Sequence, residues 1–339
     1  MSAINSKITE KIRGKAKELL ASEKISAFVG FADGTLPMTS RPFIARNPED
    51  VDRLVFNSFC VVNPAVYLPP LLKSFEPPRR PTDPPPKGPL PKVGILATGC
   101  WSRNILIQVQ ENQIARERVI VLGTGCRGMV DIRKVQSIID GKEIEKAYEL
   151  DDMISVSGKG FSEKIPLEDV LRDNCLSCIY PNPVIMDYSV GDQVPERKVD
   201  NRFPLVDEIE SRSSDQRWEW FQNEISSCIR CYACRNVCPL CYCPTCFVDD
   251  STPQWVGKSL DSSDTSIFHI LRAFHCAGRC TNCGSCETVC PMGINMRVLT
   301  SKLTKDVIDF YGTEAGLDKE APLPLTTYGK TDQQDFMVG

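Results

Sequence analysis

The sequence repeats one cysteine spacing that suits the binding of iron–sulfur clusters. The first copy is Cys228-x-x-Cys231-x-x-Cys234-x-x-x-Cys238-Pro239, and the second is Cys280-x-x-Cys283-x-x-Cys286-x-x-x-Cys290-Pro291. Three cysteines at two-residue gaps can wrap one [4Fe–4S] cubane, while the fourth, held by its proline, points to a neighbouring cubane. The spacing therefore predicts two [4Fe–4S] clusters within residues 228–290.

We expect the ligands to cross between the two runs, as in two-cluster bacterial ferredoxins. One cluster is assigned to Cys228, Cys231, Cys234 and Cys290, and the other to Cys280, Cys283, Cys286 and Cys238. Crossed ligation holds the two clusters close together, so that an electron can step between them.

Zinc sites and disulfides explain these runs less well. Structural zinc takes its four thiolates in two pairs and gives no reason for a third evenly spaced cysteine or for a Cys-Pro step. Disulfides need an oxidising compartment, and no signal peptide opens the sequence. We therefore expect a cytoplasmic protein whose 17 cysteines, against two histidines, serve mainly as metal ligands.

A second group of cysteines follows two short apolar segments, 93–97 and 119–122, each expected to be a strand. Cys100 and Cys126 lie in the glycine-containing loops after these segments, and helices are expected at 103–115 and 132–139. This order is typical of a parallel α/β sheet, which brings such loops side by side at its carboxyl edge.

Together with the later pair Cys175 and Cys178, these two loop cysteines make a set of four thiols. Such a set fits either a third [4Fe–4S] cluster or a Cys₄ zinc site. The alternative is that Cys100 and Cys126 are ordinary loop cysteines and that the Cys-x-x-Cys pair is a redox dithiol. The electron path already implied downstream favours iron.

Five cysteines lie outside these sets. A lone buried thiol is expected at Cys60. The others, Cys241, Cys243, Cys246 and Cys276, would either ligate a further metal or pack beside a cluster, and their weak spacing favours packing slightly. His269 and His275 are expected to pack or to form hydrogen bonds rather than to bind metal.

Composition bounds the class of protein. The 339 residues suffice for two or three domains, and 42% hydrophobic and 25% charged residues are ordinary for a soluble chain. A net charge of −4 argues against nucleic acid as the main partner. No apolar run has the length needed to span a membrane.

The remaining segments position these cysteines. We expect helices at 7–20, 166–172, 215–226, 268–275 and 297–311, a strand at 25–31, and an exposed segment at 76–91, where proline is abundant. The fold class is then α/β, or α+β overall, with a parallel α/β domain and a C-terminal dicluster ferredoxin-like domain. The predicted parts are 1–75 and 92–190 for the α/β domain, 76–91 for a connector, 191–213 for a linker, 214–312 for the ferredoxin-like domain and 313–339 for a tail.

Residues 93–183 resemble the beta-subunit family of deazaflavin-coenzyme-reducing hydrogenases and formate dehydrogenases. The motifs that carry the resemblance are Thr98-Gly99-Cys100, Cys126-Arg-Gly128 and Cys175-Leu-Ser-Cys178, and the run CIRCYACRNVCPLCYCPTC resembles the ferredoxin part of formate-dehydrogenase beta subunits. The chain departs from the family loop Gly-Thr-Pro-Cys, because it has Ala97-Thr98-Gly99-Cys100. It also lacks a G-x-G-x-x-G fingerprint, which this family does not use.

The resemblance implies an oxidoreductase subunit in which a cluster held by such cysteines lies next to a flavin, FAD. Flavin contacts would then come from Thr98, Ser102, Arg103, Asn104, Thr124, Arg127 and Gly128. The electrons would pass to or from another redox subunit of a hetero-oligomer, such as a heterodisulfide-reductase-like, hydrogenase or formate dehydrogenase component. Two other functions stay open from the sequence: a flavin-free iron–sulfur relay, and a zinc-braced scaffold with a two-cluster domain.

Overall fold

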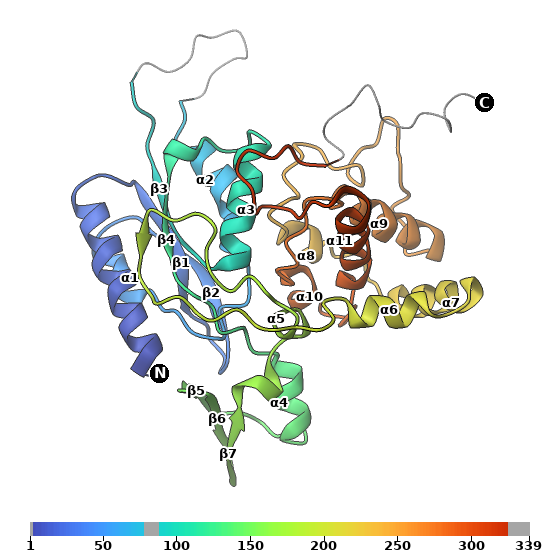
Figure 1. Cartoon of the computed structure of the whole chain (residues 1–339), viewed down its shortest axis with the longest axis horizontal. Coiled ribbons are helices and arrows are strands. Elements are labelled where there is room, and N and C mark those ends of the chain that lie inside the picture. The colour runs from blue at the N-terminus through green and yellow to red at the C-terminus, as the bar shows by residue number, and fades with distance from the viewer. Residues whose placement is uncertain (1–2, 78–87, 325–339) are drawn as a thin grey trace.

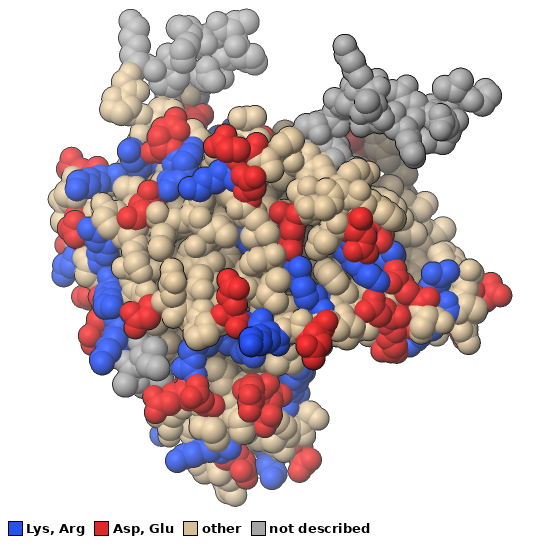
Figure 2. All heavy atoms as spheres, viewed as in Figure 1, with Lys and Arg blue, Asp and Glu red and all other residues tan. Residues whose placement is uncertain are grey.

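The computed structural model describes residues 3–77 and 88–324. An α/β unit built around a five-stranded sheet lies beside a C-terminal region of helices and cysteine-bearing loops (Figure 1). Within the described residues, no helix is long and apolar enough to cross a membrane. On the face shown in Figure 2, the basic and acidic side chains of the described residues lie interspersed.

The main sheet has the strand order β2-β1-β3-β4-β8. Its strands are β1 (Ala27–Asp33), β2 (Ser40–Ala45), β3 (Val93–Ala97), β4 (Val119–Gly123) and β8 (Tyr188–Ser189). β1, β3, β4 and β8 are parallel, and β2 pairs with β1 in the antiparallel direction at the edge. The parallel α/β arrangement expected from the sequence is confirmed.

Helices cover both faces of this sheet, which explains why β3 is buried along its whole length. In Figure 1, α1 (Ala3–Ala21) lies on one side, and α2 (Leu68–Ser74) and α3 (Gly99–Gln110) lie on the other. The core between sheet and helices includes Trp101, whose ring centroid lies 5.3 Å from that of Phe31. Short 3₁₀ turns at Asp50–Arg53, Pro64–Tyr67 and Arg116–Arg118 complete this unit.

A second sheet, absent from the sequence-based expectations, follows α4 (Ile132–Ile138). It is an antiparallel meander of β5 (Lys146–Leu150), β6 (Met153–Gly158) and β7 (Phe161–Pro166). The helix expected at 166–172 is instead the end of β7 and a 3₁₀ turn, Leu167–Val170. The expectation failed because the strand pattern here is largely polar, with one face exposed.

The C-terminal region consists of one-turn and longer helices that alternate with cysteine loops. They are α7 (Ser214–Ile225), α8 (Ala233–Asn236), α9 (Ser262–His275), α10 (Ser285–Thr288) and α11 (Arg297–Tyr311). The predicted linker, 191–213, contains α6 (Pro204–Glu210), which packs on α11 and pairs Asp207 with Lys305. The domain boundaries themselves stay predictions.

The two units are joined by buried polar contacts. The Gln108 amide nitrogen donates to the carbonyl oxygens of Ala65, at 3.1 Å, and Pro239, at 2.9 Å. The amide of Asn63 donates to the hydroxyl of Ser285 at 2.8 Å. Ile107 on α3 is fully buried and shares a small core with Leu240 and Cys276 of the C-terminal region. Because these contacts are buried, they fix how the two units sit together.

Part of the predicted tail is folded onto this junction. The Arg103 guanidinium donates to the Ala315 carbonyl and pairs with Glu314, and Leu323 joins the core around Ile107. Residues 325–339, and residues 78–87 of the predicted connector 76–91, lie outside the described residues.

The junction makes a stability prediction. Ile107→Ala should lower the free energy of unfolding by about 2–5 kcal/mol, because it empties a buried site that the C-terminal region cannot readily refill. The matched control is Ile138→Ala on α4, where the side chain is 49% exposed and the change should stay within about 0.5 kcal/mol. Urea unfolding of the anaerobic protein, followed by circular dichroism, measures both. Equal effects would contradict the importance of the junction.

Candidate metal and cofactor site

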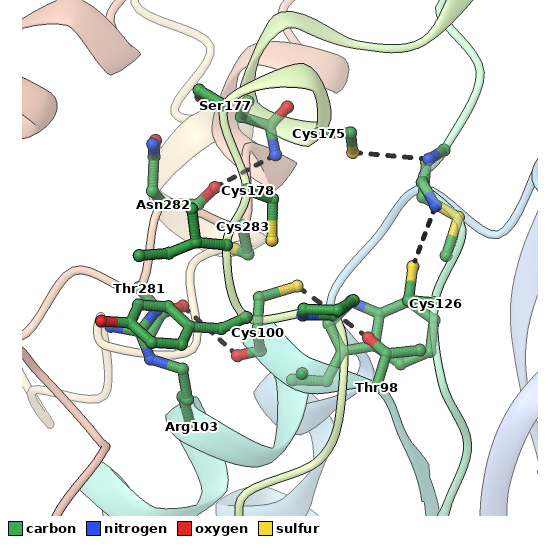
Figure 3. Close-up of a pocket in the computed structure, with 18 of the residues that line it drawn as sticks. Thr98, Cys100, Arg103, Cys126, Cys175, Ser177, Cys178, Thr281, Asn282 and Cys283 are labelled. Atoms are coloured by element: carbon green, nitrogen blue, oxygen red, sulfur yellow. Dashed lines mark hydrogen bonds between the residues drawn. The ribbon is translucent and has the colours of Figure 1, made fainter. Parts of the chain in front are cut away.

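Four cysteines from distant parts of the α/β unit line one pocket (Figure 3). Cys100 is in the first turn of α3, Cys126 follows β4, and Cys175 and Cys178 lie in and just after α5 (Asp173–Leu176). The structure thus brings together the four thiols that the sequence grouped. We call this the proximal pocket.

Glycine lets two chain segments approach each other closely beside Cys100. A Cβ added at Gly99 would lie 1.9 Å from the carbonyl oxygen of Tyr180. Only glycine therefore allows the first turn of α3 to meet the loop that carries Cys178.

Backbone amides point at two of these sulfurs. The amide of Gly128 donates to the Cys126 sulfur and the amide of Met129 to the Cys175 sulfur, each at 3.4 Å. Burial nevertheless raises the pKa of all four thiols, Cys100, Cys126, Cys175 and Cys178. Thiols that are held neutral by burial become thiolates when a bound metal supplies positive charge, and the choice here between a metal site and free thiols stays a prediction.

The pocket also reaches the C-terminal region, because Cys280 and Cys283 are among its lining residues. Among the neighbouring cysteines, Cys283 contributes most to raising the pKa of the Cys100 thiol. The carbonyl of Cys100 accepts a hydrogen bond from the Thr281 hydroxyl at 3.3 Å. The first loop of the second cysteine run therefore lies directly against the proximal pocket.

The two cysteine runs have the same backbone. In each, two residues inside the run are left-handed: Arg230 (φ 49°) and Tyr232 (φ 59°) in the first, Asn282 (φ 56°) and Gly284 (φ 71°) in the second. In each, the amide two residues after the first cysteine donates to that sulfur at 3.4 Å. A one-turn helix, α8 or α10, then follows.

The cysteines of the two runs also mix as the crossed assignment requires. Among the cysteines, Cys290 contributes most to raising the pKa of Cys228. Cys238 of the first run likewise raises the pKa of Cys280 and of Cys286 in the second run. Burial raises the pKa of Cys234 and of Cys280 to about 12. The ligand assignment stays a prediction.

His269 is a neighbour of this site that the sequence analysis expected to pack or to form hydrogen bonds. Its Nε2 lies 3.3 Å from the Cys228 sulfur, and burial lowers its pKa to about 4. The imidazole is therefore neutral at pH 7 and can donate a hydrogen bond to the sulfur. Only the helical period of α9 could have placed it on the inner face.

The remaining cysteines do not form one group. Cys241 and Cys276 lie beside Cys238, Cys246 interacts with Arg235, and Cys243 is exposed. Cys60 is buried and alone, and burial raises its pKa to about 12. Within residues 3–77 and 88–324, no three His, Cys, Asp or Glu side chains are grouped to hold a single metal ion.

Comparison with known proteins identifies the second half of this site. Residues 224–294 match the family model described as a 4Fe-4S dicluster domain. The region that carries both cysteine runs is therefore a dicluster domain. It holds two [4Fe–4S] clusters, as the spacing predicted.

Two relatives extend the similarity into the α/β unit. The chain is 26% identical over 295 residues to "F420-dependent formate dehydrogenase subunit beta" of Methanocaldococcus jannaschii, covering 68% of this chain and 75% of that protein. It is 28% identical over 168 residues to "F420-dependent formate dehydrogenase 1 subunit beta" of Methanococcus maripaludis, covering 47% and 40%. These similarities confirm the resemblance seen in the sequence and the class of the chain, an iron–sulfur oxidoreductase subunit.

Among solved structures, the chain is similar to the F420-reducing [NiFe] hydrogenase complex from Methanosarcina barkeri. The match has 17% identity and a TM-score of 0.37, and it covers 53% of this chain and 64% of that one.

The side chains predicted to contact flavin do not all have the same surroundings. Ser102, Arg103 and Asn104 are buried and bind the Gly99, Ala315 and Cys100 carbonyls, respectively. Thr98 lines the proximal pocket, and Thr124 is buried. Arg127 lines a second pocket, of about 330 Å³, and Gly128 lines both pockets, as Cys126 does.

The second pocket contains buried polar atoms that lack a hydrogen-bond partner among the described residues. The Ser58 hydroxyl and one Arg127 guanidinium nitrogen, Nη1, are buried without a hydrogen-bond partner among the described residues. Lys7 and Lys11 of α1 also line it, so that three basic side chains stand against two acids, Glu149 and Asp192. Free donors and positive charge are what a phosphate-bearing ligand requires.

The geometry at Gly99 is open to test. Gly99→Ala should displace the loop at Tyr180 and with it Cys178, because the added methyl meets backbone rather than a movable side chain. We expect less metal bound per chain, whether the four thiols hold iron or zinc, and a loss of about 1–3 kcal/mol in unfolding free energy. Gly14→Ala on α1, where nothing lies within 4 Å of the new Cβ, is the control: it should keep the metal content and raise the unfolding free energy by about 0.5–1 kcal/mol, because alanine is favoured over glycine inside a helix. Elemental analysis and urea unfolding are the measurements, and a wild-type metal content in Gly99→Ala would refute the geometry.

Proposed function

We propose that the chain is the flavin- and cluster-carrying electron-transfer subunit of a larger oxidoreductase. One observation supports it most: the proximal pocket is lined by Cys100, Cys126, Cys175 and Cys178 and also by Cys280 and Cys283 of the dicluster domain. A cluster bound by the first four would therefore adjoin the cluster assigned to Cys280, Cys283, Cys286 and Cys238, which we call the inner cluster. The outer cluster is the one assigned to Cys228, Cys231, Cys234 and Cys290.

In this proposal FAD occupies the second pocket, which shares Cys126 with the proximal pocket. Arg127, Lys7 and Lys11 would hold its phosphates, and the Ser58 hydroxyl would donate to it. Bound there, flavin exchanges electron pairs as hydride while [4Fe–4S] clusters carry single electrons. Cys126 would then adjoin both cofactors.

The outer end of the path lies near the surface of the dicluster domain. Cys231 is exposed, and the apolar side chains of Ile229 and Met292 beside it are 50% and 43% exposed. We propose that another redox subunit covers this end. The names of the relatives suggest coenzyme F420 as the hydride donor or acceptor and a formate dehydrogenase or hydrogenase as the complex. A heterodisulfide-reductase-like partner and a cytoplasmic location stay predictions.

Iron counting tests the third cluster. Three cubanes require about twelve irons per chain. Cys178→Ala should lower the count to about eight, because one of four thiolates is lost from the proximal pocket. Cys60→Ala, which removes a buried thiol outside the three predicted ligand sets, should keep about twelve. About eight irons and one zinc in the unaltered anaerobic protein would instead indicate a zinc-braced scaffold.

Flavin binding is a separate test, because it can fail while the clusters are present. Arg127→Ala should weaken FAD binding about tenfold or more, the loss expected for a charge-assisted hydrogen bond. Arg217→Ala on exposed α7 is the control and should leave the affinity unchanged. Titration of the flavin-free anaerobic protein with FAD, followed by absorbance, gives both values. If the unaltered protein binds no FAD but holds its iron, the chain is a flavin-free relay.

A further inference from the structure

Arg272 is a buried cation between the two cysteine runs. It lies on the inner face of α9 and is 4% exposed. Its Nη2 donates to the carbonyl oxygen of Cys234 at 3.0 Å. Its Nε is buried without a hydrogen-bond partner among the described residues. The relatives' names and the family model assign it no role.

No carboxylate balances this charge in the described part of the chain, since none of the ion pairs found there includes Arg272. The groups whose ionisation would act most strongly on it are instead four cysteines, Cys286, Cys238, Cys276 and Cys234. Burial opposes the charge, but these cysteines outweigh it and hold the pKa of Arg272 well above its ordinary value. A buried guanidinium needs an anionic partner, and among the described residues the cysteine sulfurs are the groups near Arg272 that can become anionic.

The anion would be a cluster with its thiolates, which carries net negative charge and gains more on reduction. A nearby fixed positive charge favours the reduced form and so raises the reduction potential. Cys286 and Cys238, the two cysteines whose ionisation would act most strongly on Arg272, both belong to the inner cluster, and Cys286 also shares a side-chain hydrogen bond with Arg272. Cys234 of the outer cluster acts less strongly, and the bond that it accepts from Arg272 uses its carbonyl and not its sulfur.

We propose that Arg272 is the counter-charge of the inner cluster and raises its reduction potential relative to that of the outer cluster. This inference rests on the ligand assignment in the proposed function. In the step that it favours, one electron leaves the cluster of the proximal pocket, which is oxidised, and reduces the inner cluster. No bond forms, and no proton moves, because the guanidinium stays protonated. Arg272 does not itself take up the electron, but its positive charge favours the inner cluster as the cluster that holds the electron.

Two variants of the full-length protein separate charge from packing. Arg272→Met removes the charge and keeps a long side chain, whereas Arg272→Lys keeps the charge. Arg116→Met is the control, because Arg116 pairs with Asp187 at the sheet edge, away from the dicluster domain. The readouts are iron per chain and the midpoint potential of each cluster, from a redox titration followed by electron paramagnetic resonance. Cys231→Ser, which alters only the outer cluster, identifies the signals.

We expect Arg272→Met to lower the midpoint potential of the inner cluster more than that of the outer one, and Arg272→Lys and Arg116→Met to keep the original order. Loss of about four irons in Arg272→Met alone, with Arg272→Lys intact, also supports a counter-charge. Unchanged potentials in Arg272→Met, a larger shift at the outer cluster, or equal iron loss in both Arg272 variants would overturn the proposal. Absence of iron from the unaltered protein would instead refute the proposed function.

Discussion

The burial of anionic sulfur is the constraint on which this structure depends. Thiolates in a protein interior need positive charge or hydrogen-bond donors around them, because burial alone keeps a thiol neutral. The chain meets this need in the same way three times. The amides of Gly128, Arg230 and Asn282 each donate to the cysteine two residues earlier at 3.4 Å. From α9, His269 contacts the Cys228 sulfur and Arg272 donates to the Cys234 carbonyl, so this helix supports the first cysteine run.

Rigid docking of the two units is the second requirement, since electron transfer needs cofactors at fixed short separations. The contacts that dock them adjoin the cysteines themselves. The Asn174 amide, next to Cys175, donates to the Asn282 carbonyl, and the Asn104 amide contacts Thr281, next to Cys280. Folding of the junction and assembly of the pockets are therefore one event. Arg103 and Asn104, which the resemblance predicts as flavin contacts, also take part in this docking.

The sequence predicted what spacing and local pattern control. Cysteine spacing identified the dicluster domain, and apolar segments 93–97 and 119–122 located the two strands that present Cys100 and Cys126. The closing helix, 297–311, has the observed bounds. What depends on long-range packing was missed. The polar strands β5 to β7 carry no strong period, and neither the place of Arg272 between two cysteine runs nor the docking of Ala315 on Arg103 leaves a local signal.

The two cysteine runs share one spacing and one backbone conformation, but different residues surround them. The equivalent left-handed positions are Tyr232 and Gly284. A Cβ at Gly284 would lie 2.6 Å from the Arg172 guanidinium of the α/β unit, so this run requires glycine. Tyr232 faces no such neighbour and packs edge-on against Phe268 of α9, 5.2 Å away. Because potentials depend on burial and on hydrogen bonds to sulfur more than on the ligands themselves, one run covered by the α/β unit and one near solvent can bind identical clusters and hold electrons differently.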